Sequence, residues 1–339
     1  MALPEPILSE RPERGPLVDT FGRVHTYVRV SVTDRCNYRC VYCLPAEGVT
    51  WMPRNHVLSF EEITRIVRAL VDMGVTGVRL TGGEPLVRHG IVELVRQLAA
   101  IPGIQDVAMT TNAHTLARHA GPLREAGLSR VNISLDTLDP QRFAALTRGG
   151  DVHKVLAGVD AALEAGLAPI KINCVVVRGQ NEQDVPALVR HFARWPDRVQ
   201  VRFIEKMPFR DEEWEVVPSA ELRERLGAEM SLSPVPRRVG QGPANTWRVA
   251  DTGQTIGFIS PMTEHFCQAC NRIRLQANGD LRTCLSRDDT PNLRDALRAG
   301  LDDAGLQQML RKMVWVKVAG HEAHTGKRTF EGVMTQIGG

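Results

Sequence analysis

The sequence predicts an α/β protein whose parallel sheet curls into a barrel, and two observations carry this prediction. Strand-like and helix-like segments alternate from Tyr27 to about Ile204, which is the pattern of parallel strands joined by helices. Polar residues interrupt these strand-like segments, whereas parallel strands covered on both faces read as nearly continuous apolar runs. A barrel explains both observations better than a flat doubly wound sheet, because it turns one face of every strand toward a common lumen.

Composition limits the classes of function. The 339 residues suffice for one large domain with an extension or for two modest domains. A net charge of +3 predicts neither a nucleic-acid surface nor a membrane-binding surface. No apolar run has the length of a transmembrane helix, and residues 1–20 lack the apolar core of a signal peptide. Seven cysteines, an odd number, favour ligation in a reducing compartment over a disulfide framework, so a cytoplasmic location is expected.

The elements can be placed in order along the chain. Residues 1–20 contain four prolines and no apolar period, and they predict a mobile N-terminal arm. Ser59 and Glu62 predict a capping box for a helix that ends before Gly74. The barrel is expected over residues 21–235, and a C-terminal extension over 236–339, after a Pro-, Arg- and Gly-rich stretch. The expected strands cover residues 28–32, 77–80, 106–110, 130–135, 170–177 and 199–204, and further helices cover 91–100, 115–126, 152–165 and 184–195.

Cations stand inside four of the expected strands: Arg29, Arg79, Lys171 and Arg202. A charge buried without a partner is strongly unfavourable, so these side chains should converge on something anionic. A lumen brings them together, and guanidinium groups bind phosphate in a bidentate manner. The pattern therefore predicts a polyphosphate ligand inside the barrel. The alternative is that each cation pairs with a carboxylate at the end of its own strand.

A cysteine triplet follows the first strand. Cys36, Cys40 and Cys43 are separated by three and then two residues. Three thiolates bound to a [4Fe–4S] cluster leave one iron open to a ligand that is not protein, which indicates chemistry rather than a purely structural site. Zinc is the alternative, but no neighbouring His or Cys supplies the fourth ligand of a closed zinc site.

A second triplet lies in the extension. It consists of Cys267, Cys270 and, after thirteen intervening residues, Cys284. His265 or the remaining Cys174 could complete a zinc site here. On the residues alone, zinc and an iron–sulfur cluster remain equally open at this triplet. Cys174 itself lies in an apolar run, where a small buried side chain is the more common role.

Two motifs resemble those of the radical S-adenosylmethionine (SAM) superfamily. One is the spacing of Cys36, Cys40 and Cys43 with an aromatic residue, Tyr42, before the last cysteine, and the other is the Gly-Gly-Glu run at residues 82–84. Within that superfamily the chain resembles the GTP 3′,8-cyclase family from about Arg23 onward. This closer resemblance rests on residues 31–43, 79–86, 202–205, 267–274 and the terminal 337–339. Gly77 departs from it, because the family often has a lysine there.

The resemblance implies a fold, cofactors and a reaction. The fold is a partial, six-stranded (β/α)6 TIM-like barrel closed by a C-terminal extension that carries a second cluster. The cofactors are two [4Fe–4S] clusters and SAM, whose reductive cleavage yields a 5′-deoxyadenosyl radical. The radical removes the ribose 3′ hydrogen of GTP, and bond formation to guanine C8 gives (8S)-3′,8-cyclo-7,8-dihydroguanosine 5′-triphosphate. This is the first step of molybdenum cofactor biosynthesis.

The resemblance also implies roles for residues. Tyr42, Gly83, Ser134 and Met207 would surround SAM, and the three cysteines of each triplet would ligate a cluster. Arg29, Arg79, Thr110, Lys171, Arg202, Arg272 and Arg274 would bind GTP. Arg272, Arg274 and the terminal Gly338 and Gly339 would form the catalytic part of the site.

The same resemblance implies partners. A reductant such as flavodoxin would supply electrons, cyclic pyranopterin monophosphate synthase would receive the product, and the chain would form a homodimer. Two other functions are weighed against this one. Another radical SAM enzyme with an auxiliary cluster, such as a peptide maturase, would carry more C-terminal cysteines. A structural metal-binding protein would have no reason to place cations within strands.

Overall fold

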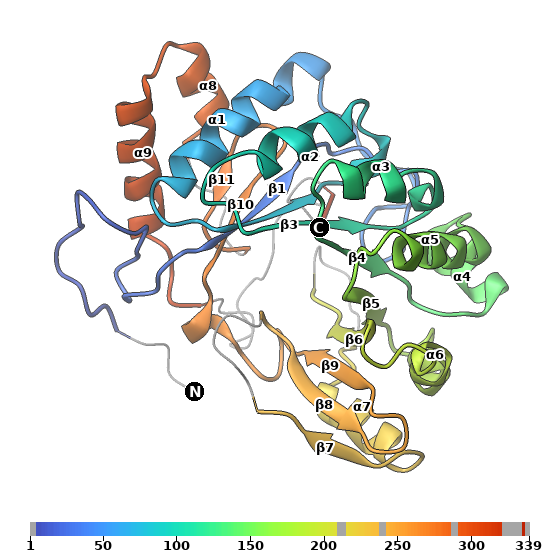
Figure 1. Cartoon of the computed structure of the whole chain (residues 1–339). Coiled ribbons are helices and arrows are strands. Elements are labelled where there is room, and N and C mark those ends of the chain that lie inside the picture. Colours follow the sequence, from blue (N-terminus) through green and yellow to red (C-terminus); the bar gives the residue numbers. More distant parts are fainter. Residues whose placement is uncertain (1–4, 209–214, 237–241, 286–290, 321–333, 336–339) are drawn as a thin grey trace.

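A curved sheet with helices along its outer side forms the framework of the computed structural model (Figure 1). The structure describes residues 5–208, 215–236, 242–285, 291–320 and 334–335. Within these residues eleven strands form one sheet in the order β11-β10-β1-β2-β3-β4-β5-β6-β9-β8-β7. The strands are β1 (Tyr27–Ser31), β2 (Gly77–Thr81), β3 (Asp106–Thr111), β4 (Arg130–Ser134), β5 (Ile170–Val176), β6 (Val199–Glu205), β7 (Leu232–Pro234), β8 (Asn245–Val249), β9 (Thr255–Ile259), β10 (Arg272–Leu275) and β11 (Leu281–Arg282).

The helices alternate with the first six strands and continue in the extension. The α-helices are α1 (Phe60–Val71), α2 (Ile91–Ala99), α3 (Ala120–Glu125), α4 (Pro140–Thr147), α5 (Val152–Glu164), α6 (Val185–Phe192), α7 (Ser219–Gly227), α8 (Leu293–Arg298) and α9 (Asp303–Trp315). Short 3-10 helices cover Arg54–His56, Pro85–Val87, Leu116–Arg118, Glu182–Asp184 and Cys267–Ala269. In the described part of the chain, no helix is both long and apolar enough to cross a membrane.

The strand pairing confirms the alternation of strands and helices. Strands β1 to β6 are parallel and follow one another in chain order. The extension then adds strands to both edges of this sheet. Strand β9 pairs with β6 and β10 pairs with β1, both in the parallel sense. Beyond them, β8 pairs with β9, β7 with β8 and β11 with β10, all in the antiparallel sense. The division into a barrel and an extension at residues 235 and 236 stays a prediction, since one sheet runs through both parts.

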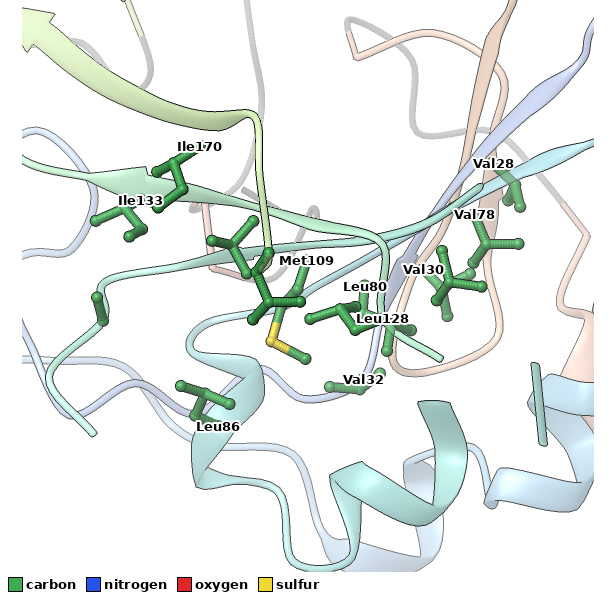
Figure 2. Close-up of a cluster of buried hydrophobic side chains, with 14 of the residues drawn as sticks. Val28, Val30, Val32, Val78, Leu80, Leu86, Met109, Leu128, Ile133 and Ile170 are labelled. Atoms are coloured by element: carbon green, nitrogen blue, oxygen red, sulfur yellow. The ribbon is translucent and has the colours of Figure 1, made fainter. Parts of the chain in front are cut away.

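Alternating side chains explain how the sheet packs. Val28 and Val30 of β1 are fully buried with Leu80 of β2 and Met109 of β3. Figure 2 shows these side chains together on the face of the sheet that carries the helices. Successive side chains of a strand point to opposite faces. Arg29, between the two valines, is therefore turned away from the helices.

Local signals placed most helix ends correctly, and one helix differs from the prediction. The amide of Glu62 donates to Ser59 Oγ at 3.1 Å, and the amide of Ser59 donates to Glu62 Oε2 at 2.7 Å, so the predicted capping box is confirmed. The helix predicted over 115–126 is divided into a 3-10 turn and α3. Pro122 accounts for this division, because it lacks the amide that a continuous helix would hydrogen-bond to Arg118.

The N-terminal segment joins the packed structure before residue 21. Leu17 and Asp19 are fully buried, and the amide of Leu17 donates to the carbonyl of Met73 at 2.8 Å. Val18 also forms an isolated antiparallel bridge with Val24. The end of the predicted arm is therefore part of the fold.

Candidate active site

The register of the strands places arginines side by side on the face of the sheet opposite the helices. Arg29 of β1 stands between Arg274 of β10 and Arg79 of β2. Arg79 is in register with Ala108 of β3, and Ala108 with Arg130 of β4. Register partners in a sheet point to the same face, which here is the face opposite the helices. Ala108, the small residue within this row of cations, is fully buried.

The remaining strand cations face the same region. Lys171 of β5 is in register with Gln200, and Arg202 of β6 is in register with Gly257. Burial, followed by the nearby Arg202, Arg130 and Arg79, lowers the pKa of Lys171 to about 6. Burial, Arg79 and Arg130 likewise lower the pKa of Arg202 to about 9. The predicted convergence of these cations is therefore observed.

Carboxylates do not neutralise this group within the described residues. Arg29, Arg79, Lys171 and Arg202 form no ion pair there, whereas Arg130 pairs with Asp106. Burial, then Arg274 and Arg79, lower the pKa of Arg29. Its Nε is buried and has no hydrogen-bond partner among the residues that the structure describes. The alternative that each strand cation pairs with a carboxylate at a strand end is wrong for these four residues.

Tyr27 and Gly77 set the position of Arg79. Tyr27 and Gly77 are opposite each other in the β1–β2 pair. A Cβ at Gly77 would lie 2.4 Å from Tyr27 Cδ2, so the ring fills the space that a side chain at Gly77 would need. Arg79 Nε donates to the Tyr27 hydroxyl at 3.0 Å, and its guanidinium carbon lies 5.6 Å from the ring centroid. Arg79 Nη1 also approaches Thr110 Oγ1 at 3.5 Å, which brings two predicted substrate residues together.

The first cysteine triplet lies on the loop after β1, at the carboxyl edge of the parallel strands. The amides of Cys43 and Leu44 donate to the carbonyl of Cys40 at 2.9 and 3.0 Å, which makes a tight turn. The amide of Tyr38 points at Cys36 Sγ at 3.4 Å. Hydrogen-bond donors directed at sulfur suit a thiolate that ligates a metal.

The electrostatics of this triplet fit a cluster. Burial raises the pKa of Cys36 to about 11 and that of Cys43 to about 12. Burial and the neighbouring Cys43 raise the pKa of Cys40 well above its usual value. Three thiols that disfavour one another's charged forms would be stabilised as thiolates by iron cations. The residues present therefore fit a [4Fe–4S] cluster.

The Gly-Gly-Glu run packs against the loop that carries these cysteines. The amides of Gly83 and Glu84 donate to the carbonyls of Thr33 and Arg35 at 2.7 and 2.8 Å. A Cβ at Gly83 would lie 2.2 Å from the Arg35 carbonyl oxygen, so only glycine fits here. Burial raises the pKa of Glu84 to about 7, although its carboxylate accepts from Thr111 and from the amide of Asn112.

The other residues predicted around SAM lie near the same edge. Tyr42 donates its hydroxyl proton to Asp136 Oδ2 at 2.6 Å, and burial raises the pKa of Asp136 to about 6. Ser134 is the last residue of β4, two positions before Asp136. Met207 belongs to a small apolar cluster with Met262, Leu285 and Met334.

The second triplet lies at the opposite edge of the parallel strands. Cys267 and Cys270 precede β10, while Cys284 follows β11, which runs back antiparallel to β10. Arg272 Nη2 is 3.9 Å from Cys270 Sγ. Burial alone would raise the pKa of Cys270, but the cations of Arg272 and Lys317 outweigh it and lower the pKa to about 6. A cysteine so easily ionised fits metal ligation, here beside arginines of the lumen.

Of the two residues considered as a fourth zinc ligand, only Cys174 is excluded by its position. Cys174 is buried within β5, with its Sγ 3.5 Å from the carbonyl of Asp136, so it belongs to the core. His265 Nδ1 is hydrogen-bonded to the carbonyl of Pro261 at 2.9 Å, an arrangement that also orients histidines that ligate a metal through Nε2. Within the described ranges, no three His, Cys, Asp or Glu side chains are grouped closely enough to hold a single metal ion. A cluster does not need such a group, because its cysteines bind different irons.

Three contributors to the site were not predicted from the sequence. Arg130 opens β4 on the same face as Asn132 and Ser134, so the alternation of that strand could have indicated it. Tyr27 precedes Arg29 by two positions and could have been found in the same way. Lys317 carried no such signal, since it lies after α9 and outside any strand. Gly338 and Gly339 lie outside the described residues.

Family models cover most of the chain. Residues 30–192 match the model described as the radical SAM superfamily, and residues 199–323 match the one described as Molybdenum Cofactor Synthesis C. Among solved structures, Streptococcus suis SuiB bound to S-adenosylmethionine is similar at a TM-score of 0.59 and 16% identity. That similarity covers 84% of this chain and 68% of SuiB, and at this identity it supports the fold alone.

Curated relatives agree over nearly the whole length. GTP 3′,8-cyclase of Pelotomaculum thermopropionicum is 45% identical over 326 residues, covering 95% of this chain and 99% of the relative. GTP 3′,8-cyclase of Listeria monocytogenes is 44% identical over 336 residues with the same coverage. The enzyme of Rhizobium etli is 45% identical and covers 91% of this chain and 88% of its own. The chain belongs to the GTP 3′,8-cyclase family of the radical SAM superfamily.

Proposed function

We propose that this chain converts GTP to (8S)-3′,8-cyclo-7,8-dihydroguanosine 5′-triphosphate, the first step of molybdenum cofactor biosynthesis. One observation carries the proposal: a lumen lined by cations lies between two cysteine triplets at opposite edges of the same parallel strands. A nucleoside triphosphate has the charge and the length to use such a lumen. Membership in the GTP 3′,8-cyclase family agrees with it.

The triphosphate of GTP is the anion proposed for the strand cations. Arg29 Nε has no acceptor in the described part of the chain, and a phosphate oxygen would supply one. Arg79 is held by Tyr27 with the rest of its guanidinium directed toward Thr110. Lys171 regains its charge when an anion approaches, because its pKa is lowered by burial and by other cations.

The second triplet is proposed to hold a second [4Fe–4S] cluster that binds the guanine base. Arg274 supports this placement because it connects the two regions. Arg274 stands beside Arg29 in register. Burial and the nearby Arg272 lower the pKa of Arg274 to about 10, while Cys270 and Cys284 act in the opposite direction. Arg272 approaches Cys270 directly. These arginines would stabilise negative charge between the second cluster and the ribose.

SAM is proposed to bind at the carboxyl edge, beside the first triplet. When bound at Cys36, Cys40 and Cys43, a reduced cluster supplies the electron that cleaves SAM into methionine and a 5′-deoxyadenosyl radical. Tyr42, Gly83, Ser134 and Met207 would orient SAM. The Gly83 amide already donates to Thr33, so the part of Gly83 is to hold the cysteine loop close to β2.

The finer architecture is proposed on the same basis. Strands β1 to β6 would form the partial barrel, and the extension would close its open side. The C-terminal Gly338 and Gly339 would enter the site. Residue Thr335 supports this, since burial raises the pKa of Cys43 and the backbone N–H of Thr335 lowers it against that effect.

Partners follow from the reaction. A reductant such as flavodoxin would deliver electrons, and cyclic pyranopterin monophosphate synthase would take up the product. The protein would act as a homodimer in the cytoplasm. The absence of a disulfide at any of its seven cysteines agrees with a reducing compartment.

An anaerobic assay tests the function. The protein is reconstituted with iron and sulfide and given dithionite and SAM, with and without GTP. 5′-Deoxyadenosine and the cyclised GTP product are then quantified for the wild type, Cys267→Ala and Cys174→Ala. The expected result is GTP-dependent formation of both products, loss of the cyclised product in C267A and retention in C174A, whose cysteine lies in the core.

Two other outcomes would contradict the proposal. SAM cleavage that is indifferent to GTP would keep the radical chemistry but require another substrate, such as a peptide. No cleavage, with zinc as the bound metal, would indicate a structural metal-binding protein.

A further inference from the structure

A buried hydrogen-bond network of polar side chains connects the N-terminal segment to the second cysteine triplet. Asp19 and His25 are fully buried, and Lys317 is 3% exposed. Asp19 Oδ2 accepts a hydrogen bond from His25 Nε2 at 2.9 Å and one from Arg23 Nε at 2.7 Å. His25 Nδ1 lies 3.5 Å from Lys317 Nζ. The hydrogen-bond network therefore leads from the carboxylate of Asp19, through His25, to the ammonium group of Lys317.

The two neighbours of His25 define its tautomer. A carboxylate can only accept, so the ring proton must be on Nε2. Nδ1 then presents its lone pair to Lys317, which can only donate. Neutral His25 thus bridges Asp19 and the ammonium group of Lys317 through its two ring nitrogens.

Lys317 uses all of its donors in this place. Its Nζ donates to the carbonyl of Arg272 at 2.7 Å, to Cys270 Sγ at 3.5 Å and to His25 Nδ1 at 3.5 Å. An ammonium group has three protons, and here each has one acceptor. The position of the group is therefore set from three directions, with one N–H directed at a sulfur.

Arg23 holds the backbone around the same point. Its Nη1 donates to the carbonyl of Cys267 at 3.0 Å and to that of Ala319 at 2.8 Å. Its Nη2 donates to the carbonyl of Val318 at 2.7 Å. Charged donors to buried carbonyls are among the stronger hydrogen bonds in proteins. Arg23 joins the N-terminal segment, the cysteine loop and the segment that carries Lys317.

We propose that Lys317 sets the reduction potential of the second cluster, and that Asp19, Arg23 and His25 hold it in position. A hydrogen bond and a positive charge at a ligating sulfur stabilise the more negative, reduced state of a cluster. This raises the reduction potential. The inference rests on the second cluster proposed above, and it assigns a role to residues that do not ligate it.

The test compares Lys317→Met with Lys312→Met. Methionine keeps the length of the side chain but removes the charge and the donors. Lys312 lies exposed on α9 and serves as the matched control. Iron content is measured after reconstitution, and both clusters are followed by electron paramagnetic resonance during a redox titration. The signal missing in Cys267→Ala identifies the second cluster.

The expected result is a second-cluster potential that becomes more negative in K317M, with the first-cluster potential unchanged and neither potential altered in K312M. An unchanged second-cluster potential in fully loaded K317M would overturn the inference. Iron for only one cluster in the wild type would instead overturn the proposed second cluster. If K317M does not load the second cluster, Lys317→Gln is used instead, because glutamine keeps N–H donors without the charge. A second cluster that loads in K317Q with a lowered potential supports the inference. A second cluster with the wild-type potential, or no loading in K317Q, overturns it.

Discussion

At the scale of single residues, a neutral neighbour positions one of the strand cations proposed to bind the triphosphate. Tyr27 supports Arg79 through its hydroxyl and its ring, and it fills the space beside Gly77. Gly77 is the position where the family resemblance leads one to expect a lysine. In this chain an aromatic ring occupies that space, so the adjacent strand contributes a positioning group in place of a further charge.

Replacing Tyr27 with phenylalanine tests this role. The ring still fills the space beside Gly77, but Arg79 loses the acceptor for its Nε. We expect GTP binding to weaken by about 1 kcal/mol, roughly fivefold in Kd, with SAM binding unchanged. Isothermal titration with each ligand provides the measurement. Equal GTP affinity of the two proteins would show that Tyr27 does not position Arg79.

If Lys171 binds the triphosphate as proposed, we expect GTP binding to depend on pH. The pKa of Lys171 is about 6 without a ligand, and a bound triphosphate raises it toward the usual value of a lysine. Above pH 6 the complex therefore binds more protons than the free protein, so affinity falls as pH rises, by up to about tenfold per unit from this group. Kd is measured from pH 6 to 9 for the wild type and Lys171→Arg, in which the charge persists. Identical slopes would contradict this assignment, because titration of GTP itself affects both proteins equally.

At the scale of elements, the loop after β1 and the turn after β2 form one unit. The amides of Gly83 and Glu84 hold the backbone that leads to Cys36, and Gly83 allows the two backbones to meet. The parallel strands bring both segments to the same edge of the sheet. The first triplet is therefore supported by a neighbouring strand as well as by its own loop.

Gly83→Ala tests this unit. The new Cβ would fall 2.2 Å from the Arg35 carbonyl oxygen, so the cysteine loop must move away from β2. We expect loss of most first-cluster iron and destabilisation by about 1–3 kcal/mol, measured by iron analysis and by denaturant unfolding. Gly121→Ala is the control, since its Cβ in α3 meets no atom within 4 Å. Normal first-cluster iron in G83A would show that the close approach of Gly83 to the Arg35 carbonyl does not support the first cluster.

At the scale of the whole molecule, the extension and the first six strands share one sheet. Strands β9 and β10 extend opposite edges of the first six strands, so the extension is distributed over both sides. Figure 1 shows α8 and α9 near α1, which places this late part of the chain beside the first helix. Thr335 is 2% exposed, and its backbone N–H lowers the pKa of Cys43 in the first triplet against the effect of burial.

Removal of Gly338 and Gly339 tests how the chain end contributes. Both clusters and SAM binding should be retained, because the cysteines and Thr335 remain. Formation of the cyclised product should fall roughly a hundredfold, as expected when substrate positioning is lost. Deletion of residues 2–4 provides the terminal control and should leave the rate unchanged. A normal rate in the C-terminal deletion would exclude the tail from the reaction.

The sequence by itself determined the features that depend on neighbours within a few positions. The six strands, the capping box of Ser59 and Glu62 and both cysteine triplets follow from local patterns of polarity and spacing. The strand cations were also predicted, because alternation alone assigns Arg29 and Arg79 to one face.

Only the tertiary structure decided which distant groups meet. Arg23 hydrogen-bonds carbonyls 244 to 296 positions away, and Lys317 reaches His25 across 292 positions. The order of the strands likewise places β10 beside β1, which brings Arg274 next to Arg29. Sequence periodicity reports the face of a strand or helix, but not its neighbours. Those contacts depend on how the whole chain packs, since burial and hydrogen bonding are satisfied only across the complete sheet.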